Sequence, residues 1–477
     1  MSRTAVAAAR PKPLAAPQST SGLLREMLWL AGPVLVENLL YVAVGFTDTW
    51  IANNLVPEGN LAGAELDAAR GTNAAAAAAV GTITYVIWFL RLVSLALGAG
   101  STALVARATG ARHRTMANAA AGQSVLLATG VGIALGLAGI VVAEPIGPLF
   151  GLEGQAQGFL VAYLKLLSLA TPFAVVTLVV NACLRGAGDT RTPAVVMGLV
   201  NALNVLLSLA LVRGWFGLPA MGFDGIAVGT AISYAVGGVV ATATLARGRR
   251  GVKLRLIRLR PHWHMSRRLL RIGLPAAWKN CVQWAANIVI VVWINQMGNL
   301  AAASHVNTIR MESFSFMSGL AFGVAAATMV GQSLGMADVD RARRSVWLAF
   351  CVGGTLMVAA GLVFVAASGA VAGLLTDDPA VRDLTATCLT ITGLVQIGFA
   401  AAIIFGSALE GAGDTFTLML INLGSTLAIR LPGVYLVTNV MGMGLVAVWL
   451  VLSGELLLRG AFLTLRFHLG GWHRIKV

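Results

Sequence analysis

The residues of this chain that could do chemistry are few, and they stand alone in long apolar stretches. A bilayer-centred charge costs about 2.5–3.5 kcal/mol on insertion scales, so each one needs a partner or a task. The chemistry open to such isolated groups is the binding and release of a proton or a small cation. Seven ionisable residues have this setting: Glu37, Asp48, Arg91, Lys279, Arg310, Glu312 and Arg430.

The first of these stretches holds two acids. Glu37 and Asp48 are 48 − 37 = 11 residues apart. On an α-helix they fall within roughly 20° of one face and about 16 Å apart along the axis. Tyr41 and Gly45 lie between them. A polar stripe on a membrane helix must face protein or a wet cavity, so this stripe is a candidate functional surface.

Depth separates the two acids. Counted from the outer end near Ala52, Asp48 lies about 6 Å deep and Glu37 about 22 Å, at about 1.5 Å per residue. Arg91 and Lys279 lie close to the level of Glu37, at about 20 and 24 Å. An acid beside a cation stays ionised, whereas a desolvated acid without one accepts a proton more readily. We therefore predict that Asp48 is the proton carrier, with Glu37 as the alternative carrier. Glu37 is expected to pair with Arg91 or with Lys279.

The composition of the chain indicates which kind of structure positions these side chains. The chain has 477 residues, of which 57% are hydrophobic and 11% charged, with a mean hydropathy of +0.82. Soluble domains carry about 25% charged residues, so we predict an all-α polytopic membrane protein. About twelve stretches reach the roughly 20 residues that a spanning helix needs. They lie near 24–51, 79–106, 116–142, 156–183, 192–213, 224–246, 267–295, 302–333, 342–368, 381–408, 417–438 and 442–465.

Charge predicts the orientation of these spans. The net charge is +15, and ten of the Lys and Arg residues lie in 247–271, which contains no acid. Because basic residues between apolar segments mark cytoplasmic loops, we read this charge as topology and not as nucleic-acid binding. Both termini are expected in the cytoplasm. The predicted organisation is a disordered tail 1–22, a first lobe 23–246, a basic linker 247–266, a second lobe 267–465 and a tail 466–477.

The two halves of the chain repeat one another. LeuArgGlyAlaGlyAspThr at Leu184–Thr190 returns as LeuGluGlyAlaGlyAspThr at Leu409–Thr415, with an offset of 410 − 185 = 225 residues. Gly110 and Gly335 share this offset. Further upstream the offset is 275 − 33 = 242 residues, so that Lys279 is the repeat partner of Glu37. A longer loop near 57–73 in the first half accounts for the difference between the two offsets. Six spans per half make two parallel lobes related by a pseudo-two-fold axis.

At these residues the chain resembles the multidrug and toxic compound extrusion (MATE) family. The likeness rests on the repeat, the doubled GlyAlaGlyAspThr loop, the pattern from Pro33 to Phe46–Ile51, and the run Thr328–Gly335, and it covers roughly residues 23–465. The resemblance implies two six-helix lobes in a V and alternating access driven by H⁺ or Na⁺.

The resemblance also implies partners for Asp48. Family members place an Asn and an Asp four residues apart on the fifth helix and a Thr on the sixth; here Asn204, Ser208 and Thr230 occupy those places, with Asn201 on the same helix face. Because Ser208 replaces a carboxylate, H⁺ is favoured over Na⁺. Interhelical packing remains the alternative role of these residues.

The second lobe offers other candidates and no cation site in its sequence. Its polar stripe lies on the seventh span, and two residues of the eighth span either line the cleft or pack. These candidates for the cleft or substrate path, besides Glu37, Tyr41 and Arg91, are Lys279, Gln283, Asn287, His305 and Glu312.

We therefore expect an ion-coupled antiporter that exports organic, often cationic, drug-like molecules by alternating access. The alternative is a flippase for lipid-linked oligosaccharides or lipids, from the same broader superfamily. An enzyme would need clustered acids or histidines, so we expect no enzymatic activity, no metal and no cofactor besides the coupling ion. The expected partners are small organic substrates and the lipid bilayer, with no nucleic acid. The protein is expected to be a monomer in the plasma (inner) membrane.

Overall fold

The computed structural model describes residues 19–56, 62–255 and 260–475. The first half folds into six long helices: α1 (Thr20–Asn53), α2 (Ala64–Gly110), α3 (Arg114–Leu149), α4 (Gly154–Gly186), α5 (Arg191–Arg213) and α6 (Phe223–Arg247). A short turn, η1 (Trp215–Gly217), joins the last two. Residues 1–18 of the predicted disordered tail 1–22 lie outside the described residues. The last residues of that tail, from Thr20, instead begin α1.

The second half repeats this plan with more interruptions. Its first three helices and its last are continuous: α7 (Trp263–Gln296), α8 (Asn299–Gly335), α9 (Val339–Ala366) and α15 (Leu445–Leu469). Between them lie the shorter helices α10 (Ser368–Gly373), α11 (Pro379–Leu394), α12 (Gln396–Ala412), α13 (Thr415–Ser425) and α14 (Leu431–Tyr435), with η3 (Thr426–Arg430) and η4 (Leu436–Val440), and η5 (Trp472–Arg474) follows α15.

Two of the predicted spans are broken helices. Helices α11 and α12 bend by 56° at one break and together form one apolar span. The span from Thr415 to Val440 contains two π-helical turns, η3 and η4, on either side of Pro432. Proline removes a backbone donor from a helix interior, and π-turns frequently mark functional sites. Arg430 lies in the first of these turns.

The apolar helices confirm the predicted fold class. Among the described residues, nine helices are long and apolar enough to cross a membrane, and the bent pair makes ten. The two remaining long helices, α1 and α7, begin the two halves and carry the polar stripes. Helix α2 begins at Ala64, inside the loop predicted near 57–73, because a run of alanine follows Glu65 and Asp67 in its first turn. Alanine is the best helix former, and acids favour helix N-termini.

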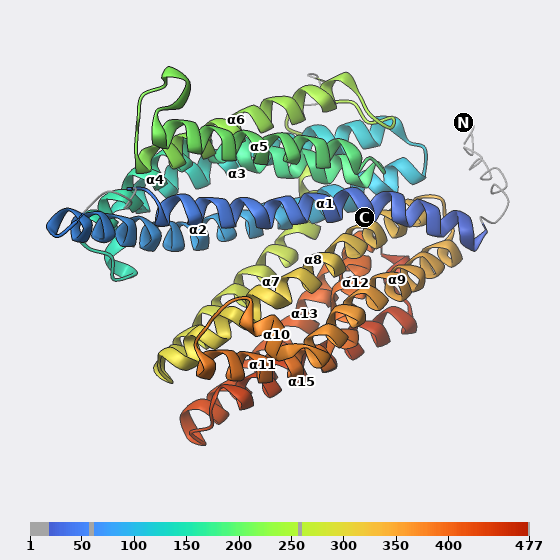
Figure 1. Cartoon of the computed structure of the whole chain (residues 1–477). Helices are drawn as coiled ribbons and strands as arrows, with labels where there is room; N and C mark the ends of the chain where they lie inside the picture. The colour runs from blue at the N-terminus through green and yellow to red at the C-terminus, as the bar shows by residue number, and fades with distance from the viewer. Residues whose placement is uncertain (1–18, 57–61, 256–259, 476–477) are drawn as a thin grey trace, which may run out of the picture.

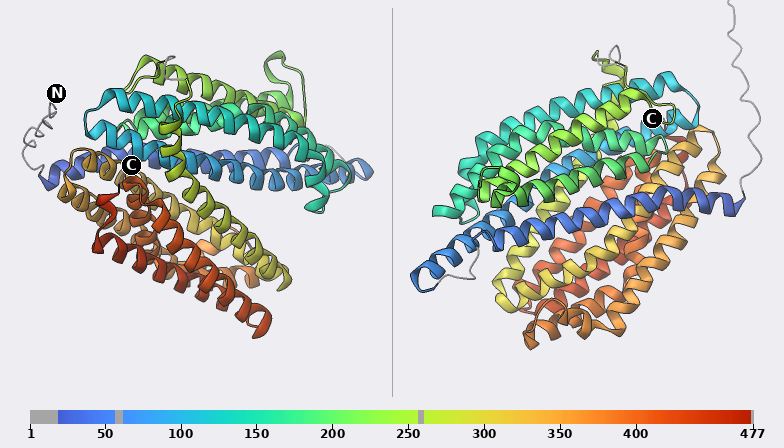
Figure 2. Two further views of the ribbon diagram at one scale, coloured as in Figure 1. Left: turned by 180° about the vertical axis from the view of Figure 1, so that it is seen from behind. Right: turned by 45° about the horizontal axis from the view of Figure 1, so that its top comes forward.

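The helices form two lobes (Figure 1). Helices α1–α6 make the first lobe and α7–α15 the second, and the lobes converge at one end and diverge at the other (Figures 1 and 2). We call the converging end the basic end, because α2 ends there near Arg107 and Arg112, and α9 begins there near Arg341. The opposite end carries Glu65 and Asp67 and is called the acidic end.

Glycines allow the lobes to touch at the basic end. A β-carbon on Gly110 would overlap the carbonyl oxygen of Gln332, and one on Gly335 would overlap that of Arg107. These are the two glycines that the 225-residue repeat relates. Close backbone approach is what small residues provide in helix packing. The repeat therefore places one glycine from each lobe at the contact.

Candidate functional site

Asp48 lies in the last two turns of α1, at the acidic end of the first lobe. Its Oδ1 is buried and has no hydrogen-bond partner. Its charge acts on the hydroxyls of Tyr163 and Tyr234, which come from α4 and α6. No ion pair to Asp48 occurs among the described residues. The carboxylate is thus surrounded by neutral polar groups of its own lobe.

Two of the predicted partners of Asp48, Asn204 and Thr230, form a hydrogen-bonded group with Tyr163, whereas Asn201 and Ser208 do not join it. Asn204 donates from Nδ2 to Thr230 Oγ1 at 2.8 Å, and the Tyr163 hydroxyl shares a 3.1 Å hydrogen bond with the same oxygen. Thr230 in turn donates to the Ile226 carbonyl at 2.9 Å. Within this group, Tyr163 is the member on which the charge of Asp48 acts, although no hydrogen bond joins the two. The side chains of Tyr163, Asn204 and Thr230 are buried in the lobe, whereas Asp48 as a whole is half-buried.

Several buried polar atoms in this lobe lack a partner. They are Asp48 Oδ1, Asn204 Oδ1, Ser208 Oγ and Asn201 Nδ2 and, elsewhere in the lobe, Thr109 Oγ1 and both amide atoms of Asn181. Asn181 lies 18 residues after Tyr163 on α4, about 27 Å along the helix, so it belongs to another region of the lobe. Buried polar groups without partners are rare and costly, so the unpaired atoms of Asp48, Asn201, Asn204 and Ser208 indicate a site for a proton, an ion or ordered water. Sequence reasoning missed Asn181, which lies in the fourth predicted span and is uncharged.

The predicted partners of Glu37 are wrong. Glu37 forms an ion pair with Arg185, whose Nη1 lies 3.3 Å from Glu37 Oε2. Arg91 instead stacks over the Tyr41 ring, 4.0 Å from its centroid. The predicted fourth span, 156–183, ends before Arg185, but α4 continues to Gly186 and carries Arg185 in its last turn. A long arginine side chain can then reach the middle of α1.

The second lobe contains the same pair with the charges exchanged. Lys279 Nζ lies 2.5 Å from Glu410 Oε1, and the pair joins α7 to α12. Lys279 is the repeat partner of Glu37 (37 + 242 = 279), and Glu410 is that of Arg185 (185 + 225 = 410). The predicted contact between Glu37 and Lys279 across the lobes is therefore replaced by one ion pair within each lobe.

Repeat-related hydrogen bonds also cross between the lobes. Asn38 of α1 donates to the Met317 carbonyl of α8 at 3.3 Å, and Asn280 of α7 donates to the Leu92 carbonyl of α2 at 3.4 Å. The donors share the 242-residue offset and the acceptors the 225-residue offset. The pseudo-two-fold axis predicted from the sequence therefore passes between α1–α2 and α7–α8.

The GlyAlaGlyAspThr segments take part in the closure of the basic end. Gln332 of α8 donates to the Gly186 carbonyl at 3.0 Å, and its repeat partner Arg107 of α2 donates to the Ala412 carbonyl at 3.4 Å. Glu26 and Arg341 add an ion pair between α1 and α9 at 2.8 Å. Each lobe thus presents the backbone of its repeated segment to a side chain of the other lobe.

A second buried polar network fills the interior of the second lobe. Glu455 is fully buried and lies between two arginines, 3.4 Å from Arg459 Nε and 3.7 Å from Arg430 Nε. Arg459 donates to Gln283 at 3.1 Å, and Arg430 donates to Asn287 at 3.4 Å. The candidates Gln283 and Asn287 therefore belong to a polar network within this lobe. Sequence reasoning missed Glu455 and Arg459, although their i,i+4 spacing in the last apolar span marked them.

His305 and Glu312 also face the interior of the second lobe. His305 is buried against the ring of Trp449, with centroids 5.5 Å apart, and its Nδ1 has no partner. Glu312 accepts a 2.6 Å hydrogen bond from Thr392. Both contacts lead away from the first lobe, to α15 and α11.

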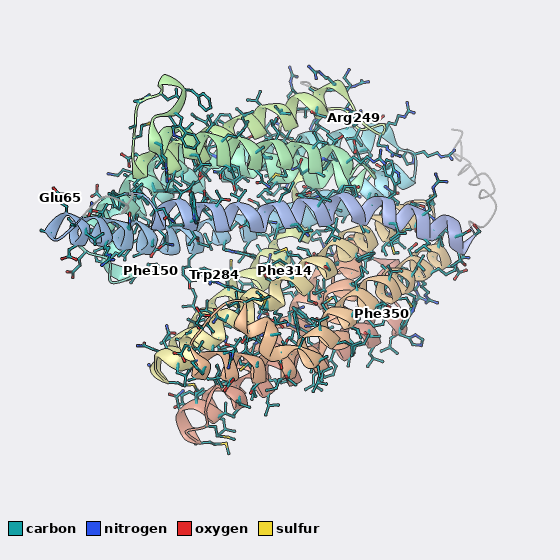
Figure 3. All side chains as sticks on the ribbon, viewed as in Figure 1. Glu65, Phe150, Arg249, Trp284, Phe314 and Phe350 are labelled. Carbon is teal, nitrogen blue, oxygen red and sulfur yellow. The ribbon has the colours of Figure 1, made fainter. Side chains whose placement is uncertain are left out.

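Aromatic side chains lie where α2 and α7 meet between the lobes. The Trp284 ring lies 6.2 Å from that of Tyr85 and 6.4 Å from that of Phe89. Tyr85 also stacks on Phe150 at 6.2 Å. Figure 3 places Phe150 and Trp284 between the diverging arms of the two lobes. Such rings offer an apolar surface, with faces that attract cations.

The described residues contain no group of three His, Cys, Asp or Glu side chains placed to hold a metal ion. Taken together, two related helical lobes, buried unpaired polar groups and closure at one end define a polytopic membrane transporter. The MatE family model matches residues 68–210 and 275–436, more than half of the chain. The chain belongs to this family, the multidrug and toxic compound extrusion transporters, as the resemblance in its sequence predicted.

Individual relatives agree along nearly the whole chain. The probable multidrug resistance protein NorM of Thermotoga maritima is 30% identical over 459 residues, 95% of this chain and 94% of that protein. The structure of the Vibrio cholerae MATE transporter VcmN matches with a TM-score of 0.84 at 18% identity, over 96% of this chain and 99% of that one. An outward-facing multidrug resistance MATE transporter matches with a TM-score of 0.82 at 19% identity, over 96% and 98%.

Proposed function

We propose that this transporter is an H⁺-coupled antiporter that exports organic, often cationic, molecules, with Asp48 as the proton carrier. The observation that carries the proposal is the buried Oδ1 of Asp48, which lacks both a hydrogen-bond partner and a cation. A carboxylate in this setting gains most from binding a proton or a cation. The names of its relatives as multidrug resistance proteins support drug-like substrates.

Neutral ligands around Asp48 favour a proton over Na⁺. Besides Asp48 Oδ1 itself, the unpaired oxygens on the predicted partners of Asp48 belong to Asn204 and Ser208, both of them uncharged. A Na⁺ site is stabilised by several oxygens and by negative charge, whereas a proton needs only the carboxylate. Asp48 is the carboxylate whose charge acts on Tyr163, the described neighbour that hydrogen-bonds to Thr230.

Alternating access follows from the closure at the basic end. We infer from the basic residues that this end faces the cytoplasm, so that the described state opens outward. Protonation of Asp48 in this state would neutralise the acid, change its interaction with the neighbouring polar groups and release the substrate outside. The lobes must then break the contacts of Gln332, Arg107 and Glu26 to open inward. Inward release of the proton restores the charge on Asp48 and completes the exchange.

The aromatic contact between the lobes supports the proposed substrate class. Tyr85, Phe89 and Trp284 bring three rings from two lobes together, and all would separate or slide as the lobes rock. Flat organic cations bind such rings by stacking and by cation–π attraction. Binding through ring faces is permissive, as export of varied molecules requires.

A flippase for anionic, lipid-linked substrates is the second candidate. Arg430 and Arg459 favour it, because the pair carries one more positive charge than Glu455 neutralises. These arginines, however, lie in the interior of the second lobe among Gln283, Asn287 and Asn422. The network therefore stabilises the broken helix α13–α14 more directly than it serves a substrate.

Transport by reconstituted protein tests the proposal. The purified chain is placed in vesicles, a fluorescent organic cation is added, and the pH gradient and the Na⁺ gradient are imposed separately. We expect uphill export with a pH gradient in Na⁺-free buffer. Export that needs a Na⁺ gradient at equal pH would reject H⁺ coupling, and transport of a lipid-linked oligosaccharide without cation export would favour the flippase.

A further inference from the structure

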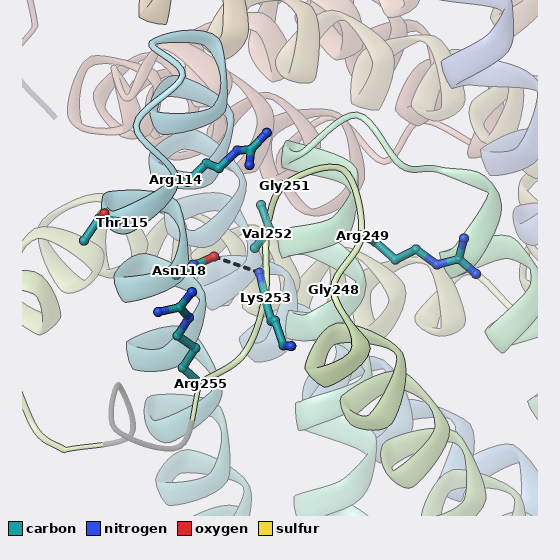
Figure 4. A pocket seen from close by; sticks show the side chains of 9 residues that line it. All are labelled: Arg114, Thr115, Asn118, Gly248, Arg249, Gly251, Val252, Lys253 and Arg255. Atoms are coloured by element: carbon teal, nitrogen blue, oxygen red, sulfur yellow. Dashed lines mark hydrogen bonds between the residues drawn. The ribbon is translucent and has the colours of Figure 1, made fainter.

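A pocket of about 390 Å³ lies at the basic end of the first lobe, away from the coupling site. Its walls come from the first turns of α3 and from the segment after α6, with Arg114, Arg249, Lys253 and Arg255 among its lining residues (Figure 4). The other lining residues are Thr115, Asn118, Gly248, Gly251 and Val252, so no acid faces the pocket. Four cations around one cavity without a carboxylate create a strong local preference for an anion.

None of these cations is neutralised elsewhere in the described part of the chain. No ion pair or hydrogen bond occupies the side chains of Arg114, Arg249, Lys253 or Arg255. All four are exposed to solvent. By contrast, the buried Arg185 and Lys279 each have an acid partner. The pocket is thus a concentration of free donors and not a structural ion-pair network.

The backbone of the pocket is held in place. Arg249 and Val252 are bridged by two hydrogen bonds of 2.9 and 2.8 Å around the turn at Gly251. The amide of Lys253 donates to Asn118 Oδ1 at 2.7 Å, which fixes the turn to α3 (Figure 4). Val252 and Leu254 are buried in the apolar core of the lobe. A fixed backbone lowers the entropic cost of binding, because the cations start from anchored positions.

The lining cations surround the turn from several sides (Figure 4). Figure 4 shows Lys253 and Arg255 on either side of the Asn118 contact, while the Arg249 side chain points away from them. Arg114 lies over the turn, because a β-carbon on Gly251 would stand 3.7 Å from its Nε. Arg114 is also the first residue of α3, where backbone amides face outward. Guanidinium forks and a helix start together suit the tetrahedral oxygens of a phosphate group.

We infer that this pocket binds an anionic phosphate group, with a phospholipid headgroup of the adjoining leaflet as its source. The position of the pocket supports a lipid. Exposed apolar side chains form one stripe along α6 at Ile232, Val239, Ala243 and Ala246, and the stripe ends two residues before Gly248. Acyl chains along this stripe would place the headgroup phosphate at the pocket. Basic pockets at the cytoplasmic side of membrane helices are typical sites for anionic lipid headgroups.

A bound lipid would have a mechanical consequence. The pocket joins α3 to the segment that leads from the first lobe to α7, and Gln123 of α3 also binds that segment at Arg260 and His262. Because α3 and that segment both line the pocket, a headgroup bound in it would fasten the connection between the lobes to the first lobe. The site would then tune how the lobes move without touching the transported substrate.

Binding to the full-length protein in detergent tests this inference. Short-chain phosphatidylglycerol, short-chain phosphatidylcholine and inorganic phosphate are titrated separately by calorimetry. The test variant is Lys253→Gln with Arg255→Gln. The matched control is Arg25→Gln with Arg474→Gln, which removes two exposed cations from the same end outside the pocket. Both variants lower the net charge equally.

We expect phosphatidylglycerol to bind more tightly than phosphatidylcholine. The pocket variant should weaken phosphatidylglycerol binding by about tenfold or more, since each lost charge-assisted contact contributes about tenfold in affinity, and the control should change it less than about twofold. Binding of inorganic phosphate that shows the same loss would keep the phosphate site but assign a soluble source. Equal loss in both variants, or none in the pocket variant, would overturn the inference. The change in thermal midpoint of each lipid-free variant separates lost binding from lost folding.

Discussion

Removing one member of the Glu37–Arg185 ion pair should destabilise the first lobe. The two side chains are only 7% and 14% exposed, so a remaining partner would keep a poorly solvated charge. At 3.3 Å and an effective dielectric of about 20, their attraction is about 5 kcal/mol. Breaking a buried pair by removing one partner costs about 3–5 kcal/mol in soluble proteins. We predict a loss in this range for Glu37→Gln.

A double variant should recover part of this loss. Glu37→Gln with Arg185→Gln leaves no unpaired charge, so it should unfold at a higher temperature than either single variant. For a unit of lobe size, a change of 1 kcal/mol shifts Tm by about 2–4 °C, so the single variants should lose roughly 6–20 °C. Thermal unfolding of the purified protein in detergent, followed by fluorescence-detected size-exclusion chromatography, measures the difference.

The second lobe supplies a sharper version of the same experiment. Glu37→Lys with Arg185→Glu rebuilds in the first lobe the arrangement that Lys279 and Glu410 have in the second. We expect this exchanged pair to be more stable than either of its single substitutions. The matched control is Glu37→Gln with Arg91→Gln, which should recover nothing, because Arg91 contacts Tyr41. Recovery by Arg91→Gln, or none by Arg185→Gln, would refute the pairing and its symmetry.

Three further predictions concern the ion, the closure and the orientation. Ser208→Asp adds a second carboxylate to the Asp48 group and should create a Na⁺ response in export at fixed pH; an unchanged Na⁺ response would place Ser208 outside the ion site. Gln332→Ala removes the hydrogen bond to the Gly186 carbonyl and should increase the population open at the basic end about 2- to 10-fold, as measured by spin-label distances between the lobes; an unchanged distance distribution would speak against a latch. Single cysteines at Arg250 and Asp378 should react from opposite sides of intact cells, the first from the cytoplasm; labelling of both from one side would reject the orientation.

The fold could be predicted from the sequence because a bilayer leaves few alternatives. Long apolar stretches must be helices, and the 225-residue repeat relates Gly110 to Gly335, which then meet between the lobes. The start of α2 could not be predicted from the sequence, because an alanine-rich helix outside the apolar core resembles a loop in a hydropathy profile. The broken helices were also missed: Pro432 marks an interruption in the span 417–438, but a π-turn at Arg430 leaves no pattern of its own in the residue types.

The candidate sites were predicted where the argument concerned residues of one helix. Asn201, Asn204 and Ser208 share a buried face because their spacing follows the helical period. The partner of Glu37 was wrong because depth along a helix does not determine which neighbouring helix supplies the cation. Arg185 and Glu410 lie in the most conspicuous motif of the chain, and only the structure shows that each reaches an oppositely charged residue, Glu37 of α1 or Lys279 of α7, to complete an ion pair.

The central claim is that Asp48 couples proton movement to export, and Asp48→Asn tests it most directly. An amide keeps the size of the carboxyl group and mimics its protonated form without titrating. The variant should fold, and it should still exchange labelled for unlabelled substrate across vesicles at equal pH. It should fail to concentrate substrate against a gradient when a pH difference is imposed. Normal proton-driven accumulation by Asp48→Asn protein would contradict the account and move the proton site to another residue.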